Sequence, residues 1–588
     1  MNRPKIAPDL AAALTAAVPA RLLRKLDAQP ALAEAWEWDE DAVTTHRDDV
    51  VHLAIEGGVV TGVTCSCLLS PRCLHVAAVV AALEPTEPTE PAESREPPSS
   101  PAATSGAPPP ASSAASSAAS AAAATFRVVA DVLAAGAEAC GAFAQAELLR
   151  SIHACRSEGL HRLASAQTRA LRSIRELRAD RPEFTLGVLA ADLREALDVA
   201  HALSAGAADP PLRGTARRDY EPIGNLRLHG VLTEAVVTRS GYAGAITYLA
   251  AETGALYTRA DVAPGDAGRA AAAYDAAAGL GDAILPHREL CRGGLFVEHA
   301  TGSADGRLGA GHKVRAVRAT EPSRWDRPPI DARFRTPLAD QLARIAARDG
   351  DPDELRPAGW DLAFIEGVIA GGPAGLAVPR GDGGDDILLR LSPAPHRMLP
   401  GRDNLAVLAR GAGLRVRAIG RVRLNAPREL DLLAIGPAPG EQRFTLPEAW
   451  HGRANVQYDR ISPLSMLIAA NGHAAAPAAA ASTAAPAPSP DDLLAPLRRR
   501  VERAVLGGAG TLPVHALAEL EREAASLDDR ALSGGAGVLR DLAALAHEPG
   551  RDPSGARRTL DRSAFARAWL RAALYEAVAR RRLGVASW

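Results

Sequence analysis

Four residues in one short stretch carry the donor atoms that a metal ion prefers: Cys65, Cys67, Cys73 and His75. Three sulfurs and one imidazole form the closed tetrahedral set of a structural Zn²⁺ site. The pattern therefore predicts one structural zinc ion. The alternative is a group of buried packing cysteines beside an unrelated histidine. A disulfide between Cys65 and Cys67 is disfavoured, because neighbours on one strand face have poor geometry for that bond.

The residues around this group predict the elements that position it. Two apolar runs, 50–55 and 59–64, flank Gly57-Gly58, a pair typical of a two-residue hairpin turn. Side chains alternate along a strand, so one face should carry Val59, Thr61, Val63, Cys65 and Cys67. An apolar helix is expected over 76–83, with His75, Val79 and Leu83 on one stripe. The sequence thus predicts a small ββα unit.

This arrangement of Cys-x-Cys, a short gap and Cys-x-His resembles the SWIM-type zinc finger. The resemblance places Cys65, Cys67, Cys73 and His75 at the four zinc-ligand positions, and it implies contacts with protein or DNA. The gap of five residues is short for that family, and Leu74 stands where many members have a basic residue. The run CSCLLSPRCLH is similar to a group of actinobacterial SWIM proteins that carries no known activity. The resemblance covers about 35 residues of the chain.

The charge around the finger bears on its partner. Residues 31–83 hold eight acids against Arg47 and Arg72, a net charge of −6. Three thiolates and one Zn²⁺ would lower this net charge by one further unit. Because DNA binding needs several cationic phosphate contacts, this charge favours a protein partner over nucleic acid. Trp36 and Trp38 could anchor such an interface or pack against the hairpin.

Composition limits the class of protein. A chain of 588 residues is long enough for about three or four domains, and its formal net charge of −2 favours neither nucleic acid nor an anionic membrane. Six cysteines make no disulfide framework. With 64 Arg against three Lys and abundant Ala, Gly and Pro, a bacterial source with a GC-rich genome is expected. No apolar run of about 18 residues is seen, so we expect a cytoplasmic protein with no membrane partner.

The order of patterns predicts an α+β multidomain chain. Two low-complexity stretches are expected to be flexible linkers. The predicted parts are N-terminal helices and the zinc finger (1–83, finger about 48–83), a Pro/Ser/Ala linker (84–124), a helical domain (125–205), a strand-rich β-domain (206–325), a second strand-rich domain (326–469), an Ala/Pro linker (470–490) and a C-terminal helical bundle (491–588).

No motif of the chain predicts catalysis, so we expect a protein that is not an enzyme. The run 306–314 is close to a phosphate loop, but Val314 replaces the Ser or Thr that would meet Mg²⁺. The leading hypothesis is a zinc-binding interaction protein. The alternative is a nucleic-acid-binding protein that uses the finger or the small β-domains, where bases could stack on aromatic side chains. The candidates for such stacking are Tyr242, Tyr248, Tyr257 and Tyr274.

Overall fold

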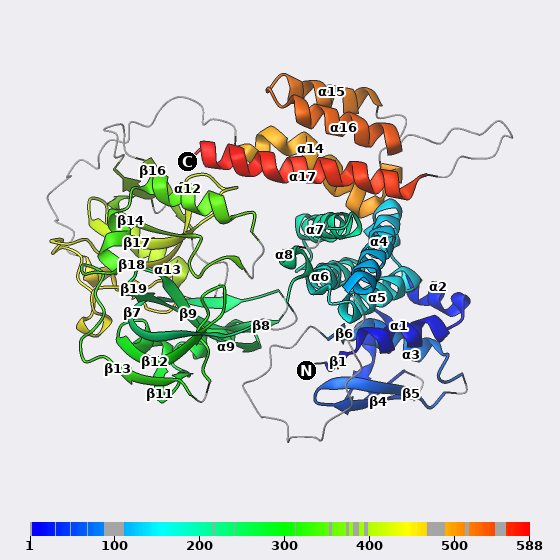
Figure 1. The fold of residues 1–588 in the computed structure, drawn as a ribbon, viewed down its shortest axis with the longest axis horizontal. Helices are drawn as coiled ribbons and strands as arrows, with labels where there is room; N and C mark the ends of the chain where they lie inside the picture. The colour runs from blue at the N-terminus through cyan, green and yellow to red at the C-terminus, as the bar shows by residue number, and fades with distance from the viewer. Residues whose placement is uncertain are drawn as a thin grey trace. The chain divides into compact units, whose positions relative to one another are not determined.

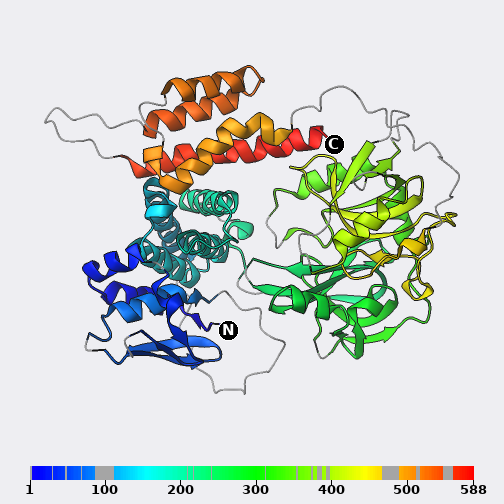
Figure 2. The same ribbon diagram turned by 180° about the vertical axis from the view of Figure 1, so that it is seen from behind.

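The computed structural model shows an α+β protein whose contacts divide into two units (Figures 1 and 2). The first unit holds the described residues within 1–91, 97–217 and 492–579, and the second holds those within 218–491 and 580–588. The structure describes residues 3–29, 31–46, 49–67, 69–86, 111–207, 209–215, 218–239, 241–311, 313–351, 355–371, 375–379, 387–392, 398–466, 489–511, 517–546 and 560–588.

A small sheet with covering helices begins the first unit. Its strand order is β2-β3-β4-β5-β1-β6. Gly57 and Gly58 both have positive φ, +60° and +81°, as the predicted two-residue turn between β4 and β5 requires. The elements are β1 (Lys5–Ile6), α1 (Pro8–Ala17), α2 (Ala20–Ala28), η1 (Leu32–Ala35), β2 (Glu37–Trp38), β3 (Ala42–Thr44), β4 (Val50–Glu56), β5 (Val59–Cys65), α3 (Leu74–Ala82) and β6 (Glu84–Pro85).

Helices make up the rest of the first unit. Those before residue 217 are α4 (Ala111–Ala135), η2 (Ala137–Ala139), α5 (Ala142–Ser157), α6 (His161–Arg178), α7 (Leu186–Ser204) and α8 (Pro210–Arg213). Those near the end of the chain are α14 (Pro490–Gly507), η6 (Ala509–Thr511), α15 (Leu517–Asp528), α16 (Ser533–Ala546) and α17 (Arg562–Ala586), of which the part from Arg580 belongs to the second unit.

One apolar core joins parts that the sequence analysis treated as separate domains. The cluster contains Val79 of α3, Leu133 of α4, Leu193 of α7 and Trp569 of α17. Polar contacts reinforce it, since Arg175 in α6 donates to the carbonyl oxygen of Leu83 at 2.6 Å. The predicted separation of 1–83, 125–205 and 491–588 is therefore wrong. The helices of these three segments bury their apolar faces against one another although the segments lie far apart in the sequence.

The predicted linker 84–124 is wrong at both ends, because Glu84–Pro85 form β6 and α4 begins at Ala111. Alanine is the strongest helix former, and Ala118 and Ala122 are buried in the core of the first unit. The expectation that no apolar run could span a bilayer is wrong for Ser116–Ala135, which is long and apolar enough to cross a membrane; 44% of it is buried within the protein. The rest of this linker, residues 87–110, lies outside the described part of the chain. So does nearly all of the second predicted linker, 470–490, of which residues 470–488 are not described.

The second unit contains a five-stranded antiparallel sheet in the order β13-β12-β7-β8-β9 and a separate two-stranded sheet, β10-β11. As predicted, the segment around 226–320 is rich in strands. Its elements are β7 (Glu221–Val237), β8 (Tyr242–Ala251), β9 (Leu256–Pro264), α9 (Ala267–Ala273), β10 (Ala277–Leu280), β11 (Ala283–Pro286), α10 (His287–Leu290), β12 (Gly294–Gly302), β13 (Arg315–Arg318) and α11 (Ile330–Arg335).

A six-stranded sheet of order β16-β15-β14-β17-β18-β19 follows within the same unit. Its elements are α12 (Leu338–Arg348), β14 (Leu362–Gly371), β15 (Gly375–Val378), β16 (Ile387–Ser392), α13 (Gly401–Leu408), β17 (Arg415–Val422), β18 (Glu429–Pro437), η4 (Glu448–Trp450), β19 (Ala454–Asn455) and η5 (Pro463–Ser465).

The two strand-rich regions are not separate domains as predicted, because they share buried contacts. Leu232 of β7 and Phe364 of β14 belong to one apolar cluster. Arg453, fully buried, donates to the carbonyl oxygen of Cys291 at 2.6 Å. The Asn455 side chain accepts from the backbone N–H of Thr233 at 2.9 Å. A boundary near residue 325 would leave these groups unpaired, which is costly for buried polar atoms.

Candidate metal centre

The β4–β5 hairpin brings Cys65 and Cys67 to one end of the small sheet. Cys65 is the last residue of β5 and pairs with Val51 of β4. The pairing shifts by one residue between Ala54 and Ile55. Because of this bulge, the predicted strand face is wrong near the turn, where Val60 is fully buried and Thr61 is exposed. The strict alternation therefore holds only in the half of the strand that leads to the cysteines.

A short loop connects the two ligand pairs, and Ser70 fixes its shape. The Ser70 hydroxyl accepts from the backbone N–H of Cys65 at 3.1 Å. The backbone N–H of Ser70 donates to the Cys67 carbonyl oxygen, also at 3.1 Å. Because both bonds join Ser70 to the strand end, the loop returns the chain toward the first two cysteines.

Helix α3 presents the second ligand pair. Cys73 is its N-cap residue, and the Cys73 sulfur accepts from the backbone N–H of Val76 at 3.4 Å. The helix begins at Leu74 rather than at the predicted residue 76, so His75 lies in its first turn. A thiolate at this position gains from the backbone N–H groups and the dipole at a helix N-terminus.

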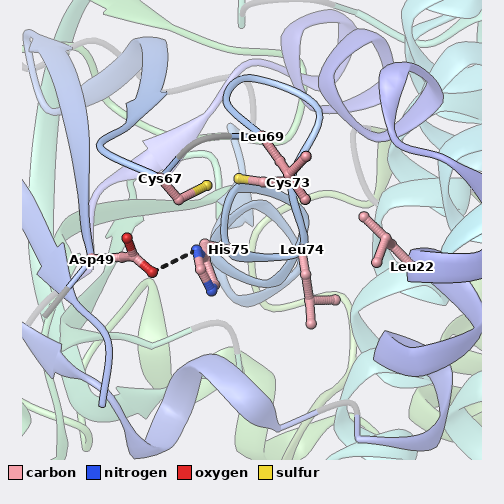
Figure 3. Close-up of a pocket in the computed structure, with 7 residues that line it drawn as sticks. All are labelled: Leu22, Asp49, Cys67, Leu69, Cys73, Leu74 and His75. Atoms are coloured by element: carbon pink, nitrogen blue, oxygen red, sulfur yellow. Dashed lines mark ion pairs between the residues drawn. The ribbon is translucent and has the colours of Figure 1, made fainter. Parts of the chain in front are cut away.

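The structure brings all four predicted residues together. One ligand atom from each of Cys65, Cys67, Cys73 and His75 lies within 4.8 Å of the others. The Cys65 sulfur is 3.7 Å from Nδ1 of His75. The sulfurs of Cys67 and Cys73 point toward each other above the His75 ring (Figure 3). This group could therefore hold a metal ion.

Burial controls the charge of these cysteines. Cys73 is 1% exposed and Cys65 is 9% exposed. Loss of water raises the pKa of the Cys65 thiol to about 12, and burial is also the main cause of the raised pKa of Cys73. Without a cation these buried thiols are protonated at neutral pH. A metal ion would supply the positive charge that stabilises their thiolates.

Two further side chains contact His75, and the sequence analysis did not assign either to the site. Trp36 is buried and packs edge-to-face on the His75 ring, with centroids 5.7 Å apart. Asp49 places Oδ2 at 3.7 Å from Nδ1 of His75. Asp49 also lines a cavity of about 380 Å³ beside the cysteines, together with Leu22, Cys67, Leu69, Cys73, Leu74 and His75 (Figure 3).

The other candidates from the sequence are mostly packed. Trp36 is buried, but its ring contact is with His75 of α3 rather than with the hairpin, and the indole N–H of Trp38 donates to the Ala33 carbonyl oxygen at 2.7 Å. Tyr248 and Tyr274 are buried, and Tyr274 stacks on Tyr458 with centroids 4.2 Å apart. Neither tyrosine is available to stack on a base.

Comparison with known proteins gives no match. No family model, no curated protein and no solved structure is similar to the chain.

Proposed function

We propose that the chain is a zinc-binding interaction protein, in which one structural Zn²⁺ folds a SWIM-type finger that contacts another protein. The observation that carries the proposal is the convergence of three sulfurs and one imidazole within 4.8 Å. Among the residues that the structure describes, no second group of this kind occurs. Cys65, Cys67, Cys73 and His75 would hold the ion, which supplies charge and a rigid tetrahedral junction.

The separation of one sulfur from the imidazole fits zinc. Bond lengths of about 2.3 Å to sulfur and 2.0–2.1 Å to nitrogen place a sulfur and a nitrogen on one tetrahedral ion about 3.6 Å apart. The Cys65 sulfur and the His75 nitrogen are 3.7 Å apart. All four ligands come from the chain, so no position is open for a substrate, as in structural rather than catalytic sites. Thiolate ligands also suit the reducing cytoplasm, where we place the protein.

Elemental analysis of the purified chain tests the metal. We expect one equivalent of zinc per chain after expression with ample zinc, and none in the Cys65→Ser/Cys73→Ser variant. The matched control is Cys140→Ser, which removes a buried thiol of the same core outside the site. Less than half an equivalent in the unaltered chain would refute a structural zinc.

Capture of partners from the native host tests the interaction. We expect a protein to be enriched by the zinc-loaded chain and lost after chelation. A salt-dependent gel shift with mixed-sequence duplex and single-stranded DNA tests the alternative. The net charge of −6 in 31–83 predicts no shift. A shift that disappears with rising salt would instead favour a nucleic-acid-binding protein.

A further inference from the structure

Backbone hydrogen bonds hold Asp49 at the same end of the small sheet as the cysteines. Its carbonyl oxygen accepts from the backbone N–H of Thr45 at 2.9 Å. The next residue, Val50, donates its N–H to the side chain of Ser66 at 2.8 Å, and Ser66 lies between Cys65 and Cys67. Continued from Val51 and Cys65, the antiparallel register places Asp49 opposite Cys67. The backbone thus holds this carboxylate at the end of the hairpin where the ligands converge.

The carboxylate is also within reach of the ligand group. Asp49 Oδ2 and Cys65 Sγ each lie 3.7 Å from Nδ1 of His75. An oxygen and a nitrogen bound to one tetrahedral zinc are about 3.3 Å apart. The observed separation exceeds this value by only a few tenths of an ångström, which a small side-chain rotation covers. Both Asp49 and His75 line the cavity, so no packed side chain separates them (Figure 3).

We propose that Asp49 is an accessory ligand of the metal centre, whose carboxylate binds the ion when His75 leaves it. The inference rests on the proposed zinc site and extends it with a fifth donor. Carboxylate oxygens are ordinary zinc ligands. Cys65 and Cys73 are buried, whereas Cys67, His75 and Asp49 are partly exposed. Exchange therefore occurs on the side of the site that faces the cavity, and the residue that Asp49 replaces is His75, whose Nδ1 lies 3.7 Å from the carboxylate.

A double-mutant cycle in the full-length chain tests this role. Zinc affinity is measured by competition with a chromogenic chelator for the unaltered chain, Asp49→Asn, His75→Ala and the double variant. We expect Asp49→Asn to weaken binding less than threefold when His75 is present. We expect about a tenfold or larger loss when His75 is absent, the scale on which single groups of a metal site act. Asp41→Asn is the matched control, because Asp41 is an exposed acid of the same module that does not line the cavity.

Equal effects of Asp49→Asn in both backgrounds would show that Asp49 acts only through its charge, which would overturn the proposal. Failure of His75→Ala to bind zinc would also overturn it. If His75→Ala does not fold, the rate of zinc release from single variants decides. Release to excess chelator should be at least threefold faster in Asp49→Asn and unchanged in Asp41→Asn; equal rates in both would refute the role. An unaltered chain that binds no zinc refutes the proposed function itself, whereas zinc binding without coupling refutes only the accessory ligand.

Discussion

Replacement of Cys73 by Ser should destabilise the first unit well beyond the finger. The sulfur is 1% exposed and caps α3. Its loss would remove one ligand from the proposed zinc site, and a structural zinc contributes about 10 kcal/mol or more to folding in peptide models. In the proposed site the metal would join the start of α3 to the hairpin, so its loss would also affect the residues that α3 covers.

The burial of α3 gives the magnitude. Four aliphatic side chains of α3 and its C-cap residue are at most 1% exposed: Val76, Val79, Val80 and Leu83. At about 2 kcal/mol for each buried aliphatic side chain, release of this face removes about 8 kcal/mol of apolar burial. A whole domain is stable by only about 5–15 kcal/mol. The loss is thus comparable with the stability of the unit, and α1, which contacts both α3 and α5, should open with it.

Hydrogen exchange measured by mass spectrometry checks this prediction. In Cys73→Ser, and in the unaltered chain after chelation, protection should disappear in β4, β5 and α3 and fall in α1 and α5. Protection in β7, β8 and β14 of the second unit should stay unchanged. Cys140→Ser, which alters a buried thiol of the same core, should keep full protection in the hairpin. Full protection of α1 and α5 beside an open hairpin would refute the shared core.

Three other predictions concern single side chains. Burial lowers the pKa of His287 to about 4, so its contribution to the stability of the second unit is complete above pH 6.5 and is lost as the pH falls toward 4. The loss should reach about 3 kcal/mol in urea unfolding, and His287→Gln should remove most of this pH dependence. Arg421→Gln should cost about 3–5 kcal/mol and lower the Tm of that unit, because it leaves the buried Glu234 and Asp361 without their cation; an unchanged Tm would contradict this. Trp36→Leu should weaken zinc binding by about tenfold in chelator competition, because the His75 ring loses its edge-to-face support; unchanged affinity would show that the ring is held by other groups.

Local features of the fold could be predicted because their causes are local. Helix α7 runs over Leu186–Ser204, as its apolar spacing predicts, and β14 runs over Leu362–Gly371, as expected for an apolar run. The hairpin turn follows from the conformational freedom of Gly57 and Gly58. The convergence of the four ligand residues follows from the same short-range geometry.

Long-range features could not be predicted from the same patterns. An amphipathic helix shows which face is buried, but not what covers it, so nothing in α17 indicated that Trp569 would share a core with Val79. The low-complexity Ser/Ala composition at the start of α4 predicts a linker, but the high helix propensity of alanine and burial in the core make it a helix. Counting back along the hairpin from the turn places Asp49 opposite Ser66, and only the bulge between Ala54 and Ile55 moves it opposite Cys67, so the sequence pattern did not reveal it.

The division of the first unit into distant segments has a consequence for synthesis. Its core needs residues on both sides of 218–491, a stretch of about 270 residues. At about 5–20 residues per second, a ribosome takes about 14–55 s to translate that stretch. During this interval the early helices have left the ribosome, but apolar side chains such as Leu133 are not yet covered by α14 and α17. The nascent chain therefore passes through a period in which chaperones can bind it, and most of the second unit is complete before the first one closes.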